Sequence, residues 1–245
     1  VMYDFLVDSH CHLNMLNNEN STIENILKNS EENGIKIFNN ICTEMSEFQD
    51  VLSLAKKYKN VFCSVGIHPE NTEKEEVTLE ELLKSTEEPK VIGIGEVGFE
   101  YHYEPINKKK QLKNFEIHIE ASRKTKLPLI IHSRDADNDM IEVLTSEIKN
   151  GEFPFVLHCF SSGKELAYKG LDLGGYISLS GIITFKNAKD LREIAKDIPV
   201  DRLMLETDSP FLAPEPKRGT KNNPGNVLYI AEYLVDFLKI PFYDI

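Results

Sequence analysis

The 245-residue sequence contains no tryptophan, few cysteines and relatively few basic side chains. Its four cysteines, Cys11, Cys42, Cys63 and Cys159, stand far apart with no Cys-x-x-Cys pair, so we expect reduced thiols and not a disulfide framework. No uncharged apolar run approaches the ~18 residues of a membrane-spanning helix, so no membrane association is expected. Residues 1–5 lack the basic region that opens a signal peptide, and we therefore expect a cytoplasmic protein.

The charge balance restricts the partners of the chain. It has 28 basic and 40 acidic residues, a formal net charge of −12 with neutral histidines. Such a surface repels phosphate backbones and disfavours tight coating of duplex DNA, although it permits a metal site that binds phosphates locally. With 41% hydrophobic and 28% charged residues, the chain has the composition of a globular domain, which excludes a disordered chain.

One structural unit repeats along the sequence. Short apolar runs alternate with longer amphipathic stretches, a pattern typical of parallel strands connected by helices. The predicted strands are residues 5–8, 35–41, 61–65, 91–94, 127–131, 155–157, 176–179 and 203–205. The predicted helices are residues 23–32, 47–58, 79–86, 109–125, 140–149, 187–197 and 227–238. Eight β/α units in about 250 residues predict an α/β fold, a (β/α)8 TIM barrel in a single domain over residues 1–245. A doubly wound open sheet is the alternative.

Polar side chains gather where the predicted strands end. Five of the seven histidines lie at such ends, namely His10, His12, His68, His132 and His158. In a TIM barrel the carboxyl ends of all strands meet on one face, where active sites are built. The sequence therefore predicts one site rich in imidazole.

The residue types at this face are those of a metal centre. His10 and His12 point to the same side of an extended segment, because strand side chains alternate with a period of two. Neutral imidazole and carboxylate are common ligands of divalent metals. The predicted ligands are His10, His12, Glu96, His132, His158 and Asp208. The two carboxylates leave two negative charges, which two divalent ions and a bridging hydroxide convert to a net positive charge that attracts an anionic substrate.

Glu96 and Asp208 are the expected catalytic carboxylates. An acid such as Glu96 can bridge or complete the metal shell, and Asp208 can accept the proton of a water molecule activated between two ions. Hydrolysis is the reaction that these groups predict. Four imidazoles favour zinc, manganese, iron or nickel over magnesium, which prefers oxygen ligands.

The motifs around these residues resemble the TatD family of metal-dependent deoxyribonucleases, within the amidohydrolase-like TIM barrels. The matching segments, in family order, are DSHCHL (8–13), GIHP (66–69), GIGEVG (93–98), IHSRDA (131–136), HCFS (158–161) and ETDSPFLAP (206–214). The resemblance implies that the six residues named above bind metal, with Glu96 bridging two ions. It also implies hydrolysis of DNA phosphodiesters, often as a 3′→5′ exonuclease on single strands, with magnesium as the usual ion. Manganese or zinc are the alternatives that the imidazole ligands favour.

The chain departs from the family pattern at three places. Asn223 stands where the family has an acid, in a loop with the sequence RGTKNNP. Glu100 stands where the family usually has aspartate. The sequence ends at Ile245, short of a final helix that such proteins usually carry, so we expect that this helix is missing.

Four residues near the expected site are candidate substrate-binding residues. His68 can contact a phosphate, or it can cap the turn before Pro69. Arg134 and Lys221 can bind phosphates, or they can be solvated surface residues with no role in binding. Tyr101 can stack on a base of a single strand, or it can pack under the loops.

The other residues at these loops have simpler interpretations. Tyr103, Phe160 and Phe211 share the two alternatives of stacking and packing. Period two sends Cys11 and Cys159 away from the neighbouring ligand histidines, so we expect buried apolar thiols. The remaining helical stripe, Gln111, Phe115 and His118, is expected to face the barrel without forming a site.

Three functions are compatible with this sequence. The first is a metal-dependent nuclease that acts on single-stranded DNA ends, as a monomer. The second is an amidohydrolase that acts on a small ester, lactone or amide with the same ligands. The third is a binding protein without catalysis, which the six intact ligands disfavour. A long open groove with basic and aromatic lining would favour the nuclease, and a small closed pocket would favour the amidohydrolase.

Overall fold

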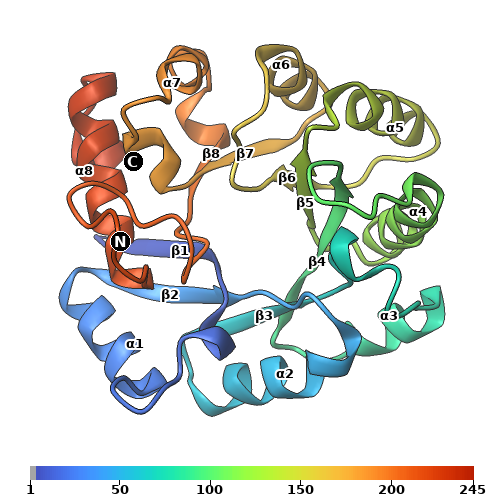
Figure 1. Ribbon diagram of the computed structural model, residues 1–245, viewed down its shortest axis with the longest axis horizontal. Helices are drawn as coiled ribbons and strands as arrows, with labels where there is room; N and C mark the ends of the chain where they lie inside the picture. The colour runs from blue at the N-terminus through green and yellow to red at the C-terminus, as the bar shows by residue number, and fades with distance from the viewer. Residues whose placement is uncertain (1–3) are drawn as a thin grey trace.

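The eight predicted apolar runs form eight β-strands in the computed structural model, which describes residues 4–245. The strands are β1 (Leu6–Cys11), β2 (Ile35–Asn40), β3 (Val61–Val65), β4 (Val91–Glu100), β5 (Leu129–Arg134), β6 (Phe155–Leu157), β7 (Tyr176–Leu179) and β8 (Leu203–Leu205). They pair in parallel and in chain order. Figure 1 shows them inside a ring of helices, so the predicted (β/α)8 barrel is confirmed. Residues 1–3, on which the expected absence of a signal peptide partly rests, lie outside the described residues.

The barrel closes where the end of β1 meets the segment after β8. The Asp208 N–H donates to His10 O at 2.8 Å, and the His12 N–H donates to Ser209 O at 2.9 Å. Below them, the buried Asp8 carboxylate accepts hydrogen bonds from the Thr207 N–H at 3.0 Å and the Thr207 hydroxyl at 2.5 Å. Burial raises the pKa of Asp8 to about 7 despite these bonds. The closure therefore places the first and last strands of the chain side by side.

Eight α-helices cover the outside of the barrel within residues 4–245. They are α1 (Ile23–Glu32), α2 (Phe48–Lys57), α3 (Leu79–Ser85), α4 (Lys108–Thr125), α5 (Asp137–Lys149), α6 (Lys164–Asp172), α7 (Lys189–Ala195) and α8 (Val227–Leu238). Seven correspond to predicted helices. The sequence did not predict α6, because this helix has no side-chain N-cap and contains Gly170, so local signals are weak. None of these helices combines the length and apolarity needed to cross a membrane.

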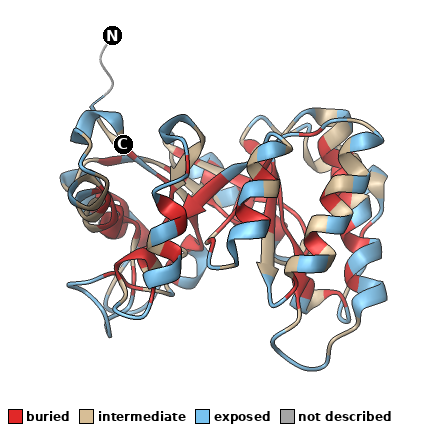
Figure 2. Ribbon diagram, turned by 90° about the horizontal axis from the view of Figure 1, so that it is seen from above, coloured by how far each residue is buried: buried red, intermediate tan, exposed pale blue. Residues whose placement is uncertain are grey.

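Two apolar layers support the fold. The larger lies between strands and helices and forms one continuous cluster of buried side chains. A smaller cluster consists of Ile41, Ile130, Val156 and Met204. It belongs to the interior of the barrel, because Ile130 and Val156 lie two positions before His132 and His158, whose side chains point inward. In Figure 2 the strands and the inner faces of the helices are buried, and the outer helix faces are exposed. The carboxyl ends of the strands therefore lie above a layer of closely packed side chains.

Strand β4 is longer than the sequence indicated. The prediction ended it at residue 94, but pairing with β5 continues from Val97–Ile131 to Glu100–Arg134, after an irregularity next to Gly95. Gly98 allows this pairing, since it has a φ of +144° and a Cβ there would lie 2.0 Å from His132 O. The extension is what brings the side chains of residues 96 and 100 alongside β5.

Replacement of Gly98 by alanine should therefore destabilise the fold strongly. We expect Gly98→Ala to lower the free energy of unfolding by more than about 3 kcal/mol, because both the φ angle and the carbonyl of His132 oppose a Cβ. The control is Gly34→Ala, which has a φ of +90° but no atom within 4 Å of its Cβ, and should cost about 1 kcal/mol. Urea denaturation measures both, and equal losses would contradict the role of the close contact.

Candidate metal centre

Glu96, in β4, lies at the middle of the histidine cluster. The residue is only 3% exposed, and each of its two carboxylate oxygens faces a different pair of imidazoles. Its Oε1 is 3.2 Å from His10 Nε2 and 3.8 Å from His12 Nε2. Its Oε2 is 2.8 Å from His158 Nε2 and 3.0 Å from His132 Nδ1. One carboxylate therefore joins two halves of the site.

The first half comes from β1 and the turn after β8. His10 and His12 lie two positions apart, and both imidazoles reach the same oxygen of Asp208, with Nε2 to Oδ1 distances of 3.3 Å and 3.2 Å. The hydrogen bond from Asp208 N–H to His10 O fixes this carboxylate beside β1. The Asp208 side chain is 15% exposed, so this edge of the site is open to solvent.

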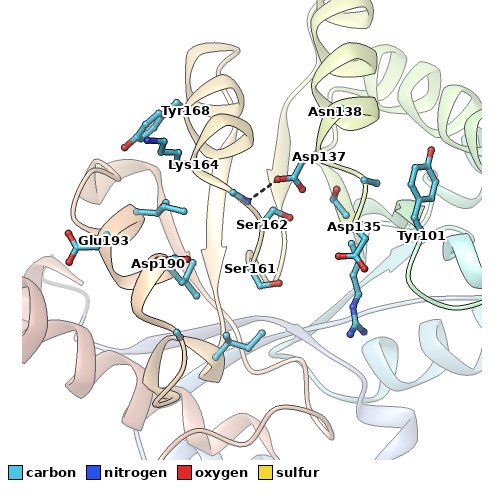
Figure 3. A pocket seen from close by; sticks show the side chains of 18 of the residues that line it. Tyr101, Asp135, Asp137, Asn138, Ser161, Ser162, Lys164, Tyr168, Asp190 and Glu193 are labelled. Atoms are coloured by element: carbon cyan, nitrogen blue, oxygen red, sulfur yellow. Dashed lines mark hydrogen bonds between the residues drawn. The ribbon is translucent and has the colours of Figure 1, made fainter.

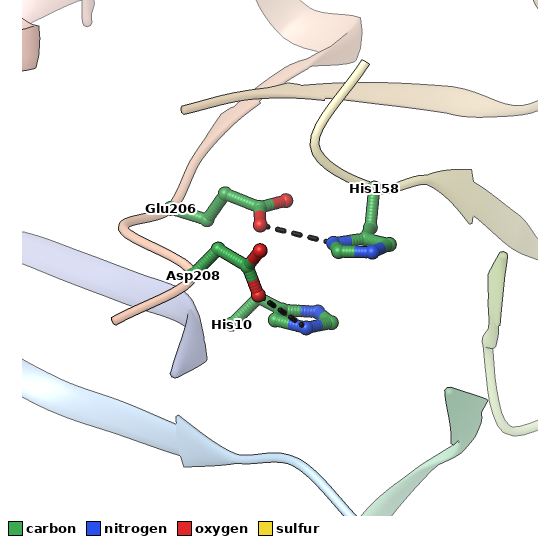
Figure 4. A group of neighbouring side chains, drawn as sticks. All are labelled: His10, His158, Glu206 and Asp208. Carbon is green, nitrogen blue, oxygen red and sulfur yellow. Dashed lines mark hydrogen bonds and ion pairs between the residues drawn. The ribbon is translucent and has the colours of Figure 1, made fainter. Parts of the chain in front are cut away.

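His158, at the end of β6, connects the two halves, because its Nε2 faces the same Glu96 oxygen as His132 while its ring lies against His10. Its ring stacks on that of His10, with the centroids 3.8 Å apart and the planes 7° apart. The Glu206 carboxylate lies 3.0 Å from His158 Nδ1 and also accepts the Cys159 N–H at 2.7 Å, so it fixes the orientation of the ring. Figure 4 shows Glu206 and Asp208 on the same side of the two stacked imidazoles.

The second half contains His132 and His68. His132 lies between two carboxylates, with Nδ1 facing Glu96 and Nε2 facing Glu100 Oε1 at 3.1 Å. His68 Nε2 is 3.4 Å from Glu96 Oε2, while its Nδ1 accepts the Glu70 N–H at 3.1 Å. His68 therefore caps the turn with one ring nitrogen, as the second sequence alternative predicts, while the other nitrogen faces Glu96. Its contact with a phosphate stays a prediction.

The cluster fits a divalent metal. Three groups of side chains each have ligand atoms within 4.8 Å of one another: His10, His158, Glu206 and Asp208; His10, His12 and Glu96; His68, Glu96 and His132. The Nδ1 atoms of His10 and His12 are buried without a hydrogen-bond partner, and an uncoordinated cluster of imidazoles repels itself when protonated. Imidazole nitrogen and carboxylate oxygen are the donors that manganese, zinc and related ions accept.

Without metal, the acids and imidazoles shift each other's pKa. Burial lowers the pKa of His10, but the Glu206 and Glu96 carboxylates outweigh it and raise the value to about 9. Burial would raise the pKa of Glu96, yet the surrounding imidazoles hold it well below its usual range. The Asp208 pKa is lowered in the same way, since hydrogen bonds to His10 and His12 exceed the effect of burial. The carboxylates thus stay ionised and ready to bind a cation.

The structure brings the six predicted ligands together and places the predicted substrate residues around them. Tyr101 donates its hydroxyl to Asp139 at 2.6 Å and stacks on Phe99, so its ring packs on the rim. The guanidinium of Arg134 lies over the Tyr103 ring at 5.0 Å, on the exposed surface. The third rim residue, Lys221, is exposed on the loop between β8 and α8. Of the four candidates, His68 is the one that contacts a carboxylate of the cluster.

A groove of about 1340 Å³ runs between α5, α6 and α7, and none of the six predicted ligands lines it. Its lining includes Ser133, which follows His132 in the sequence, and Ser161. Figure 3 shows this groove, in which Asp137 accepts the Gly163 N–H and Lys164 and Tyr168 project from α6. Its acidic lining residues are Asp135, Asp137, Asp139, Asp190, Glu193 and Asp197. Four lysine or arginine side chains accompany these six acids, so the groove has a net negative charge.

Sequence reasoning missed the residues that hold the ligands in place. Glu206 lies in the recognised ETDSP motif but was given no role, although its carboxylate lies on the same side of His10 and His158 as that of Asp208. The stripe on α4 faces the barrel as expected, and its polar members also fix backbone beside the site. Gln111 pairs with both the N–H and the carbonyl of Glu100, and His118 Nε2 accepts the Ile67 N–H at 3.0 Å.

The loop after β8 is held by a pair of asparagines. Asn222 is fully buried and donates to Thr207 O at 2.9 Å and to Phe211 O at 2.7 Å. Asn223, which stands where the family has an acid, accepts the Gly225 N–H with its side chain and caps the turn before α8. A carboxylate accepts such a bond as well as an amide does, so this cap tolerates either residue.

Comparisons with known proteins agree with this arrangement. A sequence model of the family described as TatD related DNase matches residues 7–245. A Buchnera aphidicola protein named uncharacterized metal-dependent hydrolase BU355 is 45% identical over 94% of this chain and 90% of its own. The uncharacterized metal-dependent hydrolase YcfH of Escherichia coli is 40% identical over 94% of this chain and 87% of its own. The crystal structure of YjjV, a TatD homologue from Escherichia coli, has a TM-score of 0.90 at 26% identity, covering 99% of this chain and 93% of that chain.

Loss of the charge on Glu206 should weaken metal binding. We expect Glu206→Gln to reduce affinity for Mn²⁺ or Zn²⁺ by about 10- to 100-fold, because an amide no longer holds His158 with a full negative charge. Isothermal titration calorimetry on metal-stripped protein measures the change. Glu32→Gln, on the exposed face of α1, is the matched control and should leave the Kd unchanged. An unaltered Kd in Glu206→Gln would exclude this role.

Metal binding should also release protons. The pKa of His10 is raised to about 9 and that of His158 is raised well above its usual value, so in the metal-free site both imidazoles are protonated at pH 7. A metal ion must displace these protons, so affinity should increase as the pH rises from 6 towards 9. Calorimetry in buffers of different ionisation enthalpy measures the released protons. A heat of binding independent of the buffer would contradict the expectation.

Proposed function

This chain belongs to the TatD family of metal-dependent hydrolases, and we propose that it is a deoxyribonuclease that shortens single-stranded DNA from its 3′ end. One observation carries the proposal. Glu96 is shared by two groups of potential ligands, which is the arrangement needed for two divalent ions at one carboxylate. Magnesium is our first choice by family, and manganese and zinc are the alternatives that imidazole ligands favour.

The ions would be held by the residues of the two halves. His10, His12, Glu96 and Asp208 would hold one ion, and Glu96 with His132 and His158 would hold the other. His68 faces the same Glu96 oxygen as His132 and His158. Two bound ions supply an acidified water molecule and a clamp on the phosphate oxygens. Glu100 keeps the His132 ring in place through its 3.1 Å contact, which limits the reorganisation needed during the reaction.

Asp208 is the proposed general base. Its Oδ1 faces His10 and His12, so the second oxygen, Oδ2, is the atom that accepts the proton of the attacking water. The pKa of this carboxyl is lowered by its hydrogen bonds to the two imidazoles, which outweigh burial, so it is ionised at neutral pH. Its partial exposure at the mouth permits the proton to leave to solvent after the step.

The charge around the mouth supports an anionic substrate held by its end. The loop of residues 210–224 carries Lys217, Arg218 and Lys221 with a single acid, Glu215, in a chain whose net charge is −12. A polyanion can contact this loop but is repelled by the net negative groove between α5 and α7. We therefore propose that a few terminal nucleotides bind, and that the protein acts as a monomer. The four free cysteines support a reducing compartment such as the cytoplasm.

The alternative is an amidohydrolase that acts on a small ester, lactone or amide. The observation that favours it is the groove beside Ser133 and Ser161, whose net negative charge suits a neutral or cationic substrate better than DNA. The same metal ligands serve both reactions, since both need an activated water molecule. Direct assay on the two substrate classes separates them.

The central experiment uses single-stranded DNA labelled at its 5′ end. Purified protein is incubated with magnesium, manganese or zinc in turn, and with a chelator as control. We expect a metal-dependent ladder of products that shorten from the 3′ end. Folded, metal-loaded protein that cleaves no oligonucleotide but hydrolyses a lactone or aryl ester would replace the nuclease by the amidohydrolase.

Removal of the proposed base should abolish most of this activity. We expect Asp208→Asn to lower kcat by about 10²- to 10⁴-fold, because an amide cannot accept the proton. Metal content measured on the same sample shows how much of the loss comes from weaker metal binding. The control is Asp236→Asn, on the exposed face of α8, which should keep full activity. Undiminished cleavage by Asp208→Asn would remove this residue from the mechanism.

A further inference from the structure

The aromatic residues near the mouth differ sharply in their surroundings. Phe160 is buried at 3% exposure, and Tyr101 is fixed by its hydrogen bond to Asp139. Tyr103 is exposed, but its ring faces the guanidinium of Arg134. Phe211 is 52% exposed, and its ring centroid lies 6.3 Å from that of His12 in an edge-on arrangement. An uncovered phenyl ring therefore stands directly beside a predicted metal ligand.

The backbone holds Phe211 in this position. The Phe211 N–H donates to Asp208 O at 3.0 Å, so the chain turns back immediately after Asp208. The buried side chain of Asn222 donates to Phe211 O at 2.7 Å and to Thr207 O at 2.9 Å, which ties both ends of the turn to one anchor. The ring is thus presented by a fixed turn, and its exposure does not come from a loose loop.

Asn222 also positions a cationic residue, Lys221, beside this turn. The Asn222 N–H donates to Pro210 O at 3.1 Å, so the backbone of Lys221 runs beside that of Pro210 and Phe211. Lys221 is exposed, and the loop also carries Lys217 and Arg218. A flat apolar ring and a cation on adjacent backbone segments match a nucleotide, which has a base and a phosphate one sugar apart.

We propose that Phe211 is the base-stacking residue of the substrate site and that Lys221 binds a phosphate of the same strand end. The inference rests on the proposed nuclease function and deepens it. The ring holds one of the two nucleotides that flank the scissile phosphodiester, because it lies next to His12 and Asp208. Stacking tolerates every base, so the subsite confers a requirement for a base without a preference for a sequence.

The test removes the ring and the base separately. Oligonucleotides carry an abasic residue at the 3′-terminal position, at the penultimate position or at neither, and the metal-loaded enzyme is compared with Phe211→Ala. With a complete strand, Phe211→Ala should lower kcat/KM by about tenfold, mainly through a higher KM. When the abasic residue is at one of the two positions, the kcat/KM of the wild type should fall by the same factor. The kcat/KM of Phe211→Ala should be equal on this abasic strand and on the complete strand.

Further variants separate stacking from simple packing. Phe211→Trp should retain the activity on complete strands, whereas Phe211→Leu, which keeps apolar bulk without a ring, should behave as alanine. Lys221→Ala should lower kcat/KM equally on complete and abasic strands and reduce its salt dependence. Tyr243→Ala, an exposed aromatic on the turn after α8, is the control that should change nothing.

The possible outcomes are distinguishable. Equal losses for Phe211→Ala on complete and on both abasic strands, or no loss on any, would overturn the stacking role while leaving the nuclease intact. Absence of cleavage by the metal-loaded wild type on all strands would overturn the proposed function, and the inference with it. Thermal unfolding of each variant, compared with the wild type, identifies a loss that comes from misfolding.

Discussion

A single buried carboxylate determines the organisation of this site. Glu96 is almost completely enclosed, and its two oxygens contact imidazoles contributed by β1, β5 and the end of β6. A charge buried in this way is tolerated only when opposite charge surrounds it, so the histidines and any bound cation depend on its position. That position depends in turn on the pairing of β4 with β5 beyond Gly98. The backbone geometry of one strand thus sets the metal centre.

The surface divides its charge unevenly around this centre. Acidic side chains dominate the whole chain and the groove between α5 and α7, while three cations gather on the loop of residues 210–224. Phe211 and Lys221 lie on this loop, and Asn222 ties it back to the strand end that carries Asp208. The cationic loop and the exposed ring therefore lie on the same side of the mouth. This coincidence supports the proposal of a substrate held by its end.

Local sequence periodicity was sufficient to predict most elements of the fold. All eight strands and seven of the helices follow from apolar runs and amphipathic stretches, because burial of one face requires those periods. The two largest departures from the predicted elements have a common cause. Residues 95–100 read as a loop because of their glycines, and α6 has weak local signals, but pairing with β5 and packing on the barrel override these preferences.

The sequence by itself determined the ligand types and the face on which they lie. A period of two pairs His10 with His12, and the strand ends of a parallel barrel converge whatever their side chains. Only the tertiary structure decided which groups touch. Glu206 orients His158 across 48 residues of chain, and an exposed ring at Phe211 cannot be told from a packed one by its neighbours in sequence. Such contacts depend on distances between segments, which local patterns do not encode.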